Sequence, residues 1–337
     1  MLLREVSTQV LLGVVLAILA ICTAIGQLLK RQPDSAIHPA VVRTFNSRVQ
    51  AWWLLCASVA LAFLIGREAT IVLFFIISFW ALREFITLTP TRLGDHRALF
   101  WVFFLLAPLQ YVLILLGPEM YGLYSIAIPV YGFLFIPARI ALSGDYKRFL
   151  ERAAKIQAGL LICVYTLSFA PALLDLELVP YGASAAVVAR GENPSPVVRA
   201  ESASPAAGLL FYFLLIAQLA EVMQYFWSQL LGRHVIAPEI NSSRTWEGFC
   251  GGVASSTLVG ISLWWATPFN YWQSACMSAV IAILGFAGGM TMSAIKRDRG
   301  VRDYGTLVEG HVGVLDRIDS ICFAAPVFFH LTKYFFT

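Results

Sequence analysis

The chain has 337 residues, of which 59% are hydrophobic and only 13% are charged, and its formal net charge is +4. Its mean hydropathy of +0.74 is too high for a soluble domain. We therefore expect an integral membrane protein with the lipid bilayer as a partner and with no nucleic-acid partner.

A helix that crosses a bilayer needs about 20 mostly apolar residues. Windows of this kind predict an all-α polytopic membrane protein with about ten transmembrane helices. The predicted spans lie near 9–29, 50–66, 69–87, 98–117, 122–142, 156–176, 206–231, 248–268, 273–295 and 319–336. The division of 50–87 into two spans is the weakest of these boundaries. The first window is read as a span, because no clear small-x-small cleavage site follows it.

Basic residues orient the predicted spans, because short cytoplasmic loops carry an excess of Lys and Arg. If the loop 30–49 is cytoplasmic, so are the loops around 83–97, 139–155, 232–247 and 296–318. These loops contain all Lys and Arg of the chain except Arg4, Arg67, Arg190, Arg199 and Lys333. The distribution predicts that both termini lie outside. It also explains the basic segment 143–155 as an anchor at the headgroups.

The spans divide the chain into three parts. Residues 1–176 form an N-terminal region of about six transmembrane helices. Residues 177–205, rich in Ala, Ser, Pro and Val, form an extracytoplasmic loop. Residues 206–337 contain most of the polar groups that composition alone does not require, so we expect a polar active site in this C-terminal region, facing the cytoplasm.

An ionisable residue inside a predicted span is the first candidate. Glu221 lies in the apolar segment 206–231, one helical turn before Gln224. Because a carboxylate within a span is costly, it marks a functional site by default. The alternative is that Glu221 pairs with an Arg of another helix or stays protonated.

The loop from Gly232 to Gly252 combines amide, hydroxyl and charged groups before three glycines. Its candidate residues are Ser242, Ser243, Arg244, Thr245, Glu247 and Gly248. A helix N-terminus with small residues and hydroxyls can bind phosphate. Equally, the hydroxyls can cap the helix while the glycines allow close helix packing. The segment alone does not decide between the two.

The segment Ser293–Ser320 brings together five basic and five acidic residues among glycines. From Val314 onward it can be helical, which places Asp316 and Asp319 on one face. Burying two carboxylates costs several kcal/mol each unless a cation compensates them, and Arg317 projects to another side. Mg²⁺ commonly binds one or two carboxylates plus substrate phosphates. The alternative is a solvated helix start, with acids near the positive end of the dipole.

This last segment resembles the signature of CDP-diacylglycerol synthases, also called phosphatidate cytidylyltransferases. The positions in register are Ser293, Ile295, Lys296, Arg297, Asp303, Gly305, His311, Gly313, Asp316, Arg317 and Asp319. Two upstream elements of that family resemble Ser242, Arg244, Thr245, Glu247 and Gly248, and Glu221, Gln224 and Tyr225. The resemblance covers about residues 206–337.

Several positions depart from the family's pattern. Arg244 and Arg302 stand where Lys is usual, Glu221 where Asp is usual, and Ser243 and Glu309 where Pro is usual. Val312 and Ser228 replace glycines. The chain therefore resembles a divergent member, and a changed lipid specificity or a weakened enzyme stays open.

The resemblance implies the transfer of CMP from CTP to phosphatidic acid or a related lipid phosphate, giving CDP-diacylglycerol and pyrophosphate for phospholipid biosynthesis. It implies a Mg²⁺ ion held by Glu221, Asp316 and Asp319, with a second cation such as K⁺ left open. The implied catalytic residues are Asp303, Asp316, Asp319, His311 and Lys296. The implied substrate-binding residues are Ser242, Ser243, Arg244, Thr245, Glu247, Gly248, Arg297, Arg302 and Arg317. The expected location is a bacterial inner membrane, and a homodimer is left open.

Three other functions remain as alternatives. The protein would be a CTP-dependent enzyme acting on another lipid phosphate, a transporter with Glu221 and Gln224 along its path, or an inactive membrane scaffold. The absence of internal repeats, and the polar residues gathered on one side, argue against the transporter.

Overall fold

The computed structural model describes residues 6–30, 39–88, 91–178, 206–301 and 313–337. In these ranges the regular secondary structure is helical apart from one two-stranded hairpin, β1–β2. The α-helices and strands are α1 (Val6–Lys30), α2 (Pro39–Ile65), α3 (Arg67–Leu88), α4 (His96–Trp101), α5 (Ala107–Leu116), α6 (Tyr121–Ile126), α7 (Phe133–Ala141), α8 (Phe149–Leu160), α9 (Leu167–Ala172), α12 (Ala206–Leu231), β1 (Val235–Ala237), β2 (Asn241–Thr245), α13 (Trp246–Ser262), α14 (Tyr271–Asp298) and α15 (Leu315–Phe336).

Short 3₁₀ and π-helical turns extend several of these helices into longer segments. The 3₁₀ turns are η2 (Leu93–Asp95), η4 (Pro118–Met120), η7 (Leu173–Asp175) and η8 (Trp264–Ala266), and the π turns are η3 (Val102–Leu106), η5 (Ala127–Gly132) and η6 (Leu161–Thr166). In this way α4 to α9 form the continuous segments Leu93–Leu116, Pro118–Ala141 and Phe149–Asp175.

Each predicted span overlaps a helical segment of the structure, although 248–268 runs past the end of α13 at Ser262. Six segments are long and apolar enough to cross a membrane: Arg67–Leu88, Leu93–Leu116, Pro118–Ala141, Phe149–Asp175, Ala206–Leu231 and Tyr271–Asp298. The all-α membrane fold is therefore confirmed. Because α1, α2, α13 and α15 are not among the six, the count of about ten crossings stays a prediction.

The weakest predicted boundary falls at a single residue. Gly66 separates α2 from α3 with φ +143°, a backbone conformation that residues with a Cβ rarely adopt. At its other end α2 begins at Pro39, before the predicted start near 50. Arg43, Asn46 and Arg48 lower the hydropathy of this first part without preventing a helix.

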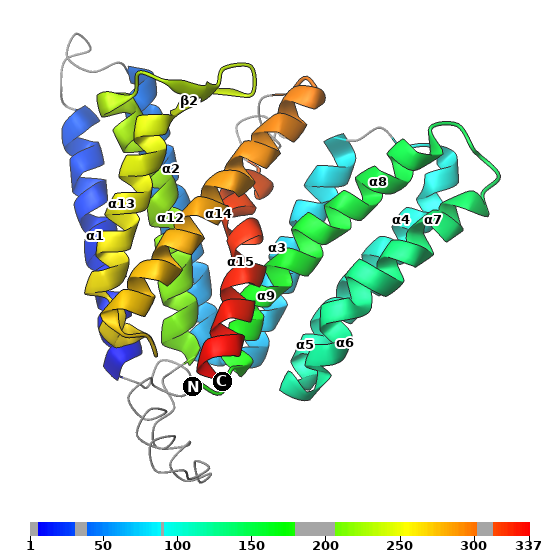
Figure 1. Cartoon of the computed structure of the whole chain (residues 1–337), viewed down its shortest axis with the longest axis horizontal. Helices are drawn as coiled ribbons and strands as arrows, with labels where there is room; N and C mark the ends of the chain where they lie inside the picture. The colour runs from blue at the N-terminus through cyan, green and yellow to red at the C-terminus, as the bar shows by residue number, and fades with distance from the viewer. Residues whose placement is uncertain (1–5, 31–38, 89–90, 179–205, 302–312) are drawn as a thin grey trace.

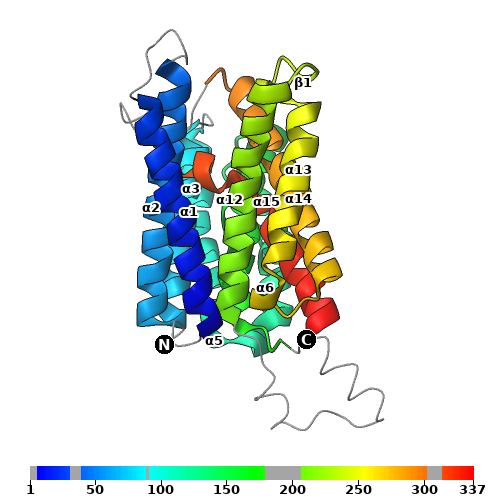
Figure 2. The same cartoon turned by 90° about the vertical axis from the view of Figure 1, so that its left-hand side faces the viewer.

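Figure 1 shows two groups of helices, α1, α2 and α12–α14 in one and α3–α9 in the other, with α15 between them. Helix α12 contacts α1, α13, α14 and α15, while α15 also contacts α3 and α9. Figure 2 shows α12 between α1 and α13 from the side. Helix α15 therefore joins the two groups.

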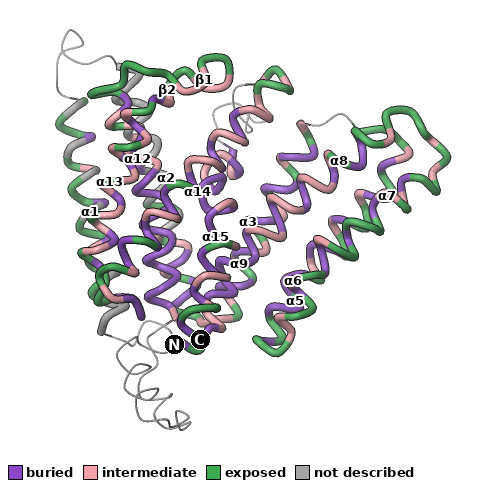
Figure 3. The backbone as a smooth tube through the Cα atoms, viewed as in Figure 1, coloured by how far each residue is buried: buried purple, intermediate pink, exposed green. Residues whose placement is uncertain are grey.

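Burial follows this arrangement. Inner faces of α12 and α15 are buried, and the outer faces of many helices are exposed (Figure 3). The rings of Phe213 and Phe328 stack between α12 and α15, with centroids 5.1 Å apart. Large apolar residues such as Leu54 and Leu134 remain exposed. A continuous apolar exterior suits a bilayer, in which the helices satisfy their own backbone polar groups.

The hairpin and the end of α14 lie at one end of the molecule, whereas α1 begins and α15 ends at the opposite end (Figures 1 and 2). The connection between α7 and α8 also lies at the hairpin end. These segments are among those predicted to share one side of the membrane.

The segment 143–155 has a second function that its composition did not indicate. Arg152 is only 5% exposed. Its Nε donates to Oδ1 of Asp95 at 2.8 Å, and its Nη1 lies 3.0 Å from Oδ2 of Asp145. The prediction of a headgroup anchor is therefore wrong for Arg152, which holds two connections of the helices together.

Candidate active site

One face of α12 carries polar side chains at the level of the hairpin. Gln224 is buried, with 2% of its surface exposed, and Glu221 lies one turn earlier and is half-buried. Nε2 of Gln224 donates to the carbonyl oxygen of Ala282 at 3.3 Å. Because a buried amide needs such partners, this bond fixes α12 against α14.

The segment predicted as a polar loop from Gly232 to Gly252 contains a hairpin. Val235 pairs with Thr245, and Ala237 pairs with Asn241, in antiparallel register. Strands this short give too little alternation of polar and apolar residues for a sequence-based prediction.

Asn241 holds the start of β2 in place. Its Oδ1 accepts a hydrogen bond from Oγ of Ser243 at 2.7 Å, and its Nδ2 donates to Oγ of Ser293 at 3.2 Å. Ser242 and Ser243 are exposed. The two predicted serines are therefore accessible from outside, next to the end of α14.

Arg244, near the end of β2, points into the helices. Its Nη1 donates to Oε1 of Gln224 at 2.9 Å, and its Nη2 lies 3.8 Å from Oε1 of Glu221. Its Cζ lies 6.0 Å from the centre of the Phe286 ring. Glu221 thus lies beside an Arg, but one from β2 and not from another helix as the alternative interpretation had it.

Asp319 approaches the same place from α15. It is 8% exposed, and the charged groups that act on it are Glu221, Arg244 and Asp316. A Cβ added to Gly289 would lie 3.4 Å from Nη2 of Arg244 and 3.6 Å from Oδ2 of Asp319. The ends of both side chains therefore meet at Gly289, where α12, β2, α14 and α15 come together.

Asp316 has a basic partner of its own. Nζ of Lys296, in the last turns of α14, donates to Oδ1 of Asp316 at 2.7 Å. Both side chains are largely buried, at 17% and 10% exposed. Lys296 and Asp316 are therefore in direct contact, whereas Asp319 lies near Arg244.

The glycine-rich start of α13 shows the capping and packing arrangement. Oγ1 of Thr245 accepts from the backbone N–H of Gly248 at 3.1 Å and donates to Oγ of Ser228 at 3.1 Å. A Cβ on Gly248 would lie 1.8 Å from Oγ of Ser228, and one on Gly252 would lie 2.2 Å from Cγ of Gln224. These glycines let α13 pack closely on α12. Phosphate binding by this segment stays a prediction.

Glu247 fixes the hairpin to α13. Its Oε1 lies 2.5 Å from Nδ1 of His234, and its Oε2 accepts from the backbone N–H groups of Arg233 and His234 at 3.2 Å each. The hydrogen bond from His234 lowers the pKa of Glu247 from its ordinary value to about 2. Glu247 is therefore ionised at neutral pH and holds the base of the hairpin.

Of the remaining predicted residues, two are described by the structure and three are not. Nε of Arg297 donates to the carbonyl oxygen of Ile240 at 3.1 Å, which ties α14 to the hairpin. The carbonyl oxygen of Arg317 accepts from Nε2 of Gln218 at 3.0 Å. Arg302, Asp303 and His311 lie outside the described residues.

The predicted metal ligands are close to one another but do not form a compact set. Carboxylate oxygens of Glu221, Asp316 and Asp319 are suitable ligands for Mg²⁺. Within the described ranges, no three His, Cys, Asp or Glu residues are grouped closely enough to hold a metal ion. Arg244 and Lys296 compensate these carboxylates instead. Mg²⁺ binding here stays a prediction.

Two contacts of α15 were missed by the sequence reasoning. Glu84 of α3 accepts hydrogen bonds from the backbone of Val314 and Leu315, and Gln218 of α12 donates to that of Arg317. The only sequence signal is a polar residue near or within an apolar segment, the signal that singled out Glu221.

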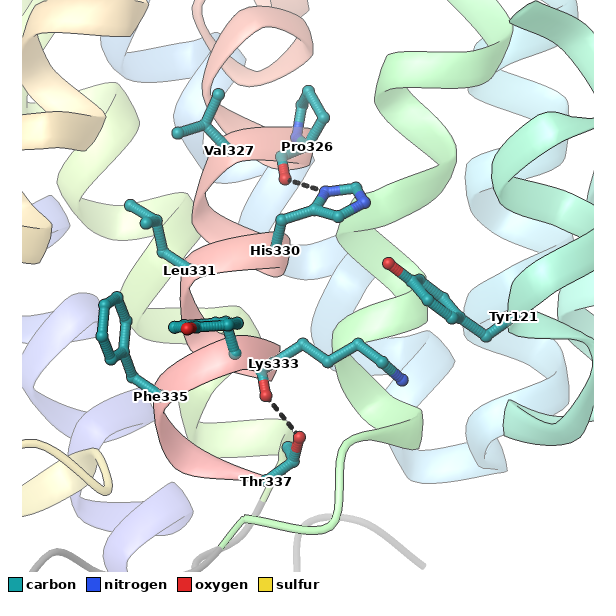
Figure 4. Close-up of a pocket in the computed structure, with 9 residues that line it drawn as sticks. Tyr121, Pro326, Val327, His330, Leu331, Lys333, Phe335 and Thr337 are labelled. Atoms are coloured by element: carbon teal, nitrogen blue, oxygen red, sulfur yellow. Dashed lines mark hydrogen bonds between the residues drawn. The ribbon is translucent and has the colours of Figure 1, made fainter. Parts of the chain in front are cut away.

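A separate cavity of about 860 Å³ lies at the other end of α15. Figure 4 shows Tyr121, His330 and Lys333 around it. Nδ1 of His330 donates to the carbonyl oxygen of Pro326 at 2.6 Å, and Nζ of Lys333 lies 3.9 Å from the centre of the Tyr121 ring. The cavity shares none of its lining residues with the candidate site.

Comparison with known proteins shows which family the chain resembles. Residues 46–335 match the family model described as "Cytidylyltransferase family". The chain belongs to the cytidylyltransferase family. The resemblance found in the C-terminal sequence is thereby confirmed, and the match extends into α2, well before the signature residues.

Individual relatives support a divergent position within the cytidylyltransferase family. The chain is 33% identical over 330 residues to the "Uncharacterized protein YnbB" of Escherichia coli strain K12, covering 96% of this chain and 97% of that protein. It is 34% identical over 120 residues to a phosphatidate cytidylyltransferase of Staphylococcus haemolyticus, and 38% identical over 127 residues to one of Synechocystis. Those matches cover 35% and 36% of this chain, and 46% and 43% of the two relatives.

Proposed function

We propose that this cytidylyltransferase acts on phosphatidic acid, transferring CMP from CTP to give CDP-diacylglycerol and pyrophosphate. The observation that supports it most is the gathering of Arg244 and Lys296 with Glu221, Asp316 and Asp319 at one junction of four elements. Two relatives that carry the name phosphatidate cytidylyltransferase point to the same substrate.

The reaction needs charge neutralisation more than proton transfer. A phosphate oxygen of phosphatidic acid would form a bond to the α-phosphorus of CTP, while the bond to the oxygen that bridges the α- and β-phosphorus breaks. Pyrophosphate leaves with that electron pair. Because the attacking oxygen is already an anion, positioning and cations supply most of the catalysis.

The basic side chains of the site are suited to hold these phosphates. The planar guanidinium of Arg244 can donate two parallel hydrogen bonds to one phosphate, and the ammonium of Lys296 can donate to another. Ser242 and Ser243 are exposed beside the end of α14 and can donate hydroxyl hydrogen bonds. Arg302, Asp303 and His311 are proposed members of the site on sequence alone.

Mg²⁺ is proposed as the cofactor, held by Glu221, Asp316 and Asp319, which would have to come closer together than they are in this structure. When bound, the ion would neutralise negative charge on the phosphates and on the leaving pyrophosphate. For this, Arg244 and Lys296 would exchange their carboxylate contacts for contacts with the substrate phosphates. A second cation such as K⁺ and a homodimer belong to the same proposal.

The proposed setting is a bacterial inner membrane with the hairpin end facing the cytoplasm, where CTP is available. The loops predicted to be cytoplasmic contain most of the Lys and Arg, which favours this orientation. Phosphatidic acid would reach the site from the bilayer, because its acyl chains can remain among the helices.

A second candidate is a cytidylyltransferase acting on another lipid phosphate. The relative that matches along almost its whole length is described only as uncharacterized, and Arg244 stands where the family pattern has Lys. The test is to incubate the purified protein with CTP, Mg²⁺ and a panel of lipid phosphates, including phosphatidic acid and a polyprenyl phosphate, and to follow pyrophosphate release.

We expect pyrophosphate release with phosphatidic acid, and a loss of at least about 100-fold in Asp319→Asn, with thermal unfolding little changed. Asp298→Asn, at a largely exposed carboxylate of α14, is the matched control. Release only with another lipid phosphate would support the second candidate. Near-native turnover in Asp319→Asn would contradict the assigned site, and no turnover with any lipid phosphate would favour a transporter or scaffold.

A further inference from the structure

The first turn of α15 is held by a residue from the other half of the chain. Oε1 of Glu84 accepts from the backbone N–H of Val314 at 3.0 Å, and Oε2 accepts from that of Leu315 at 2.9 Å. Glu84 lies in α3, 230 positions before Val314 in the sequence. One carboxylate thus binds two successive amides of the helix that carries Asp316 and Asp319.

These two bonds supply what the local sequence lacks. The first N–H groups of a helix have no partner within the helix, and the side chain of Val314, at the N-cap position, cannot accept a hydrogen bond. An ionised carboxylate at this position makes charge-assisted hydrogen bonds and lies at the positive end of the helix dipole.

Gln218 holds the same turn from α12. Its Nε2 donates to the carbonyl oxygen of Arg317 at 3.0 Å, and the residue is only 8% exposed. Glu84 therefore holds this turn by its amides and Gln218 by a carbonyl group, with Asp316 between the two contacts. Neither residue is among the groups that meet at Gly289.

We propose that Glu84 and Gln218 are positioning residues that fix Asp316 and Asp319 in the orientation needed for catalysis. This inference rests on the proposed cytidylyltransferase reaction and adds two residues to it. It also gives α3, from the group of helices α3–α9, a direct role in setting the site. A rotation of the first turn of α15 would move Asp316 away from Lys296 and Asp319 away from Arg244 together.

The test compares Glu84→Gln, Glu84→Asp and Gln218→Met with Glu68→Gln, which changes an exposed carboxylate at the other end of α3. In Glu84→Gln we expect kcat to fall roughly tenfold or more while KM for CTP changes little, because a misplaced group lowers the rate of the chemical step. Glu84→Asp should recover part of the loss, since it keeps the charge. Gln218→Met should show the same kcat effect in smaller size, and Glu68→Gln none.

A second measurement detects the hydrogen bonds of Glu84 independently of enzyme activity. Hydrogen exchange at the amides of Val314 and Leu315 should be about tenfold faster in Glu84→Gln than in the wild type and unchanged in Glu68→Gln. Faster exchange with unchanged kcat would overturn the positioning role, as would losses that follow thermal stability alone with no recovery in Glu84→Asp. A wild type that releases no pyrophosphate with any lipid phosphate would overturn the proposed function, and the positioning role with it, while exchange would still decide whether Glu84 holds the turn.

Discussion

At the scale of single residues, Arg244 is the side chain on which the site depends most. It contacts Gln224, lies beside Glu221, and reaches Gly289 together with Asp319. Its guanidinium therefore compensates two carboxylates that come from different helices. Glu221, Asp316 and Asp319 stood out in the sequence because charges are rare in this chain. Arg244 and Lys296 were also candidates, but which carboxylate each one contacts was not predictable, since a contact between β2 and α12 leaves no local pattern.

Replacing Arg244 by Lys should impair both turnover and stability. Lys keeps the charge but loses the planar fork that reaches Gln224 and Glu221 at once, so we expect at least about a tenfold lower kcat/KM and a destabilisation of about 2 kcal/mol. Pyrophosphate release and thermal unfolding measure the two effects. Arg83→Lys, at an exposed residue of α3, is the control. Wild-type turnover in Arg244→Lys would show that bidentate contacts are unimportant.

At the scale of elements, the contact between α12 and α13 determines the geometry of the site. Gly248, Gly251 and Gly252 face Ser228, Trp227 and Gln224 of α12 at distances that leave no room for a Cβ. The prediction of the helices themselves succeeded because apolar windows of about 20 residues are a strong signal. The small hairpin and the extension of α2 to Pro39 were missed, because short strands and polar helical turns give no distinct pattern in the hydropathy of the sequence.

Gly252→Ala should therefore separate α13 from α12. Its Cβ would lie 2.2 Å from Cγ and 2.8 Å from the backbone nitrogen of Gln224, so we expect a destabilisation of about 1–3 kcal/mol and lower turnover. Thermal unfolding monitored by tryptophan fluorescence measures the first effect. Gly122→Ala in α6 is the matched control, because nothing lies within 4 Å of its Cβ position. Equal stability of the two variants would show that the helices can separate without cost.

At the scale of the whole molecule, α15 lies between the two groups of helices and receives contacts from both. The C-terminal motif was sufficient to predict the family, but not how the N-terminal helices take part. The contact of Glu84 with Val314 spans 230 positions, and no periodicity or spacing in one sequence encodes such a pair. The hairpin, the end of α14 and the connection between α7 and α8 lie at one end of the molecule. All three are in segments predicted to be cytoplasmic from their Lys and Arg.

The orientation of the whole molecule can be tested by reporter fusions. Alkaline phosphatase needs disulfide bonds that form outside the cytoplasm, so a fusion after Thr337 should be active and a fusion after Gly300 inactive. Fluorescent-protein fusions at the same positions, which mature in the cytoplasm, serve as the reciprocal control. The reverse pattern would place the hairpin end outside, away from CTP.

Pro326 has a mechanical consequence for the site. It lies inside α15 and cannot donate a hydrogen bond to the carbonyl oxygen of Cys322, so the helix is least stiff at this point. The part before Pro326 is fixed by Glu84, Gln218 and Lys296, whereas the part after it is held by ring packing around Phe328. A bend of the helix at Pro326, for example in a bilayer of different thickness, would therefore move the distal half and leave Asp319 in place.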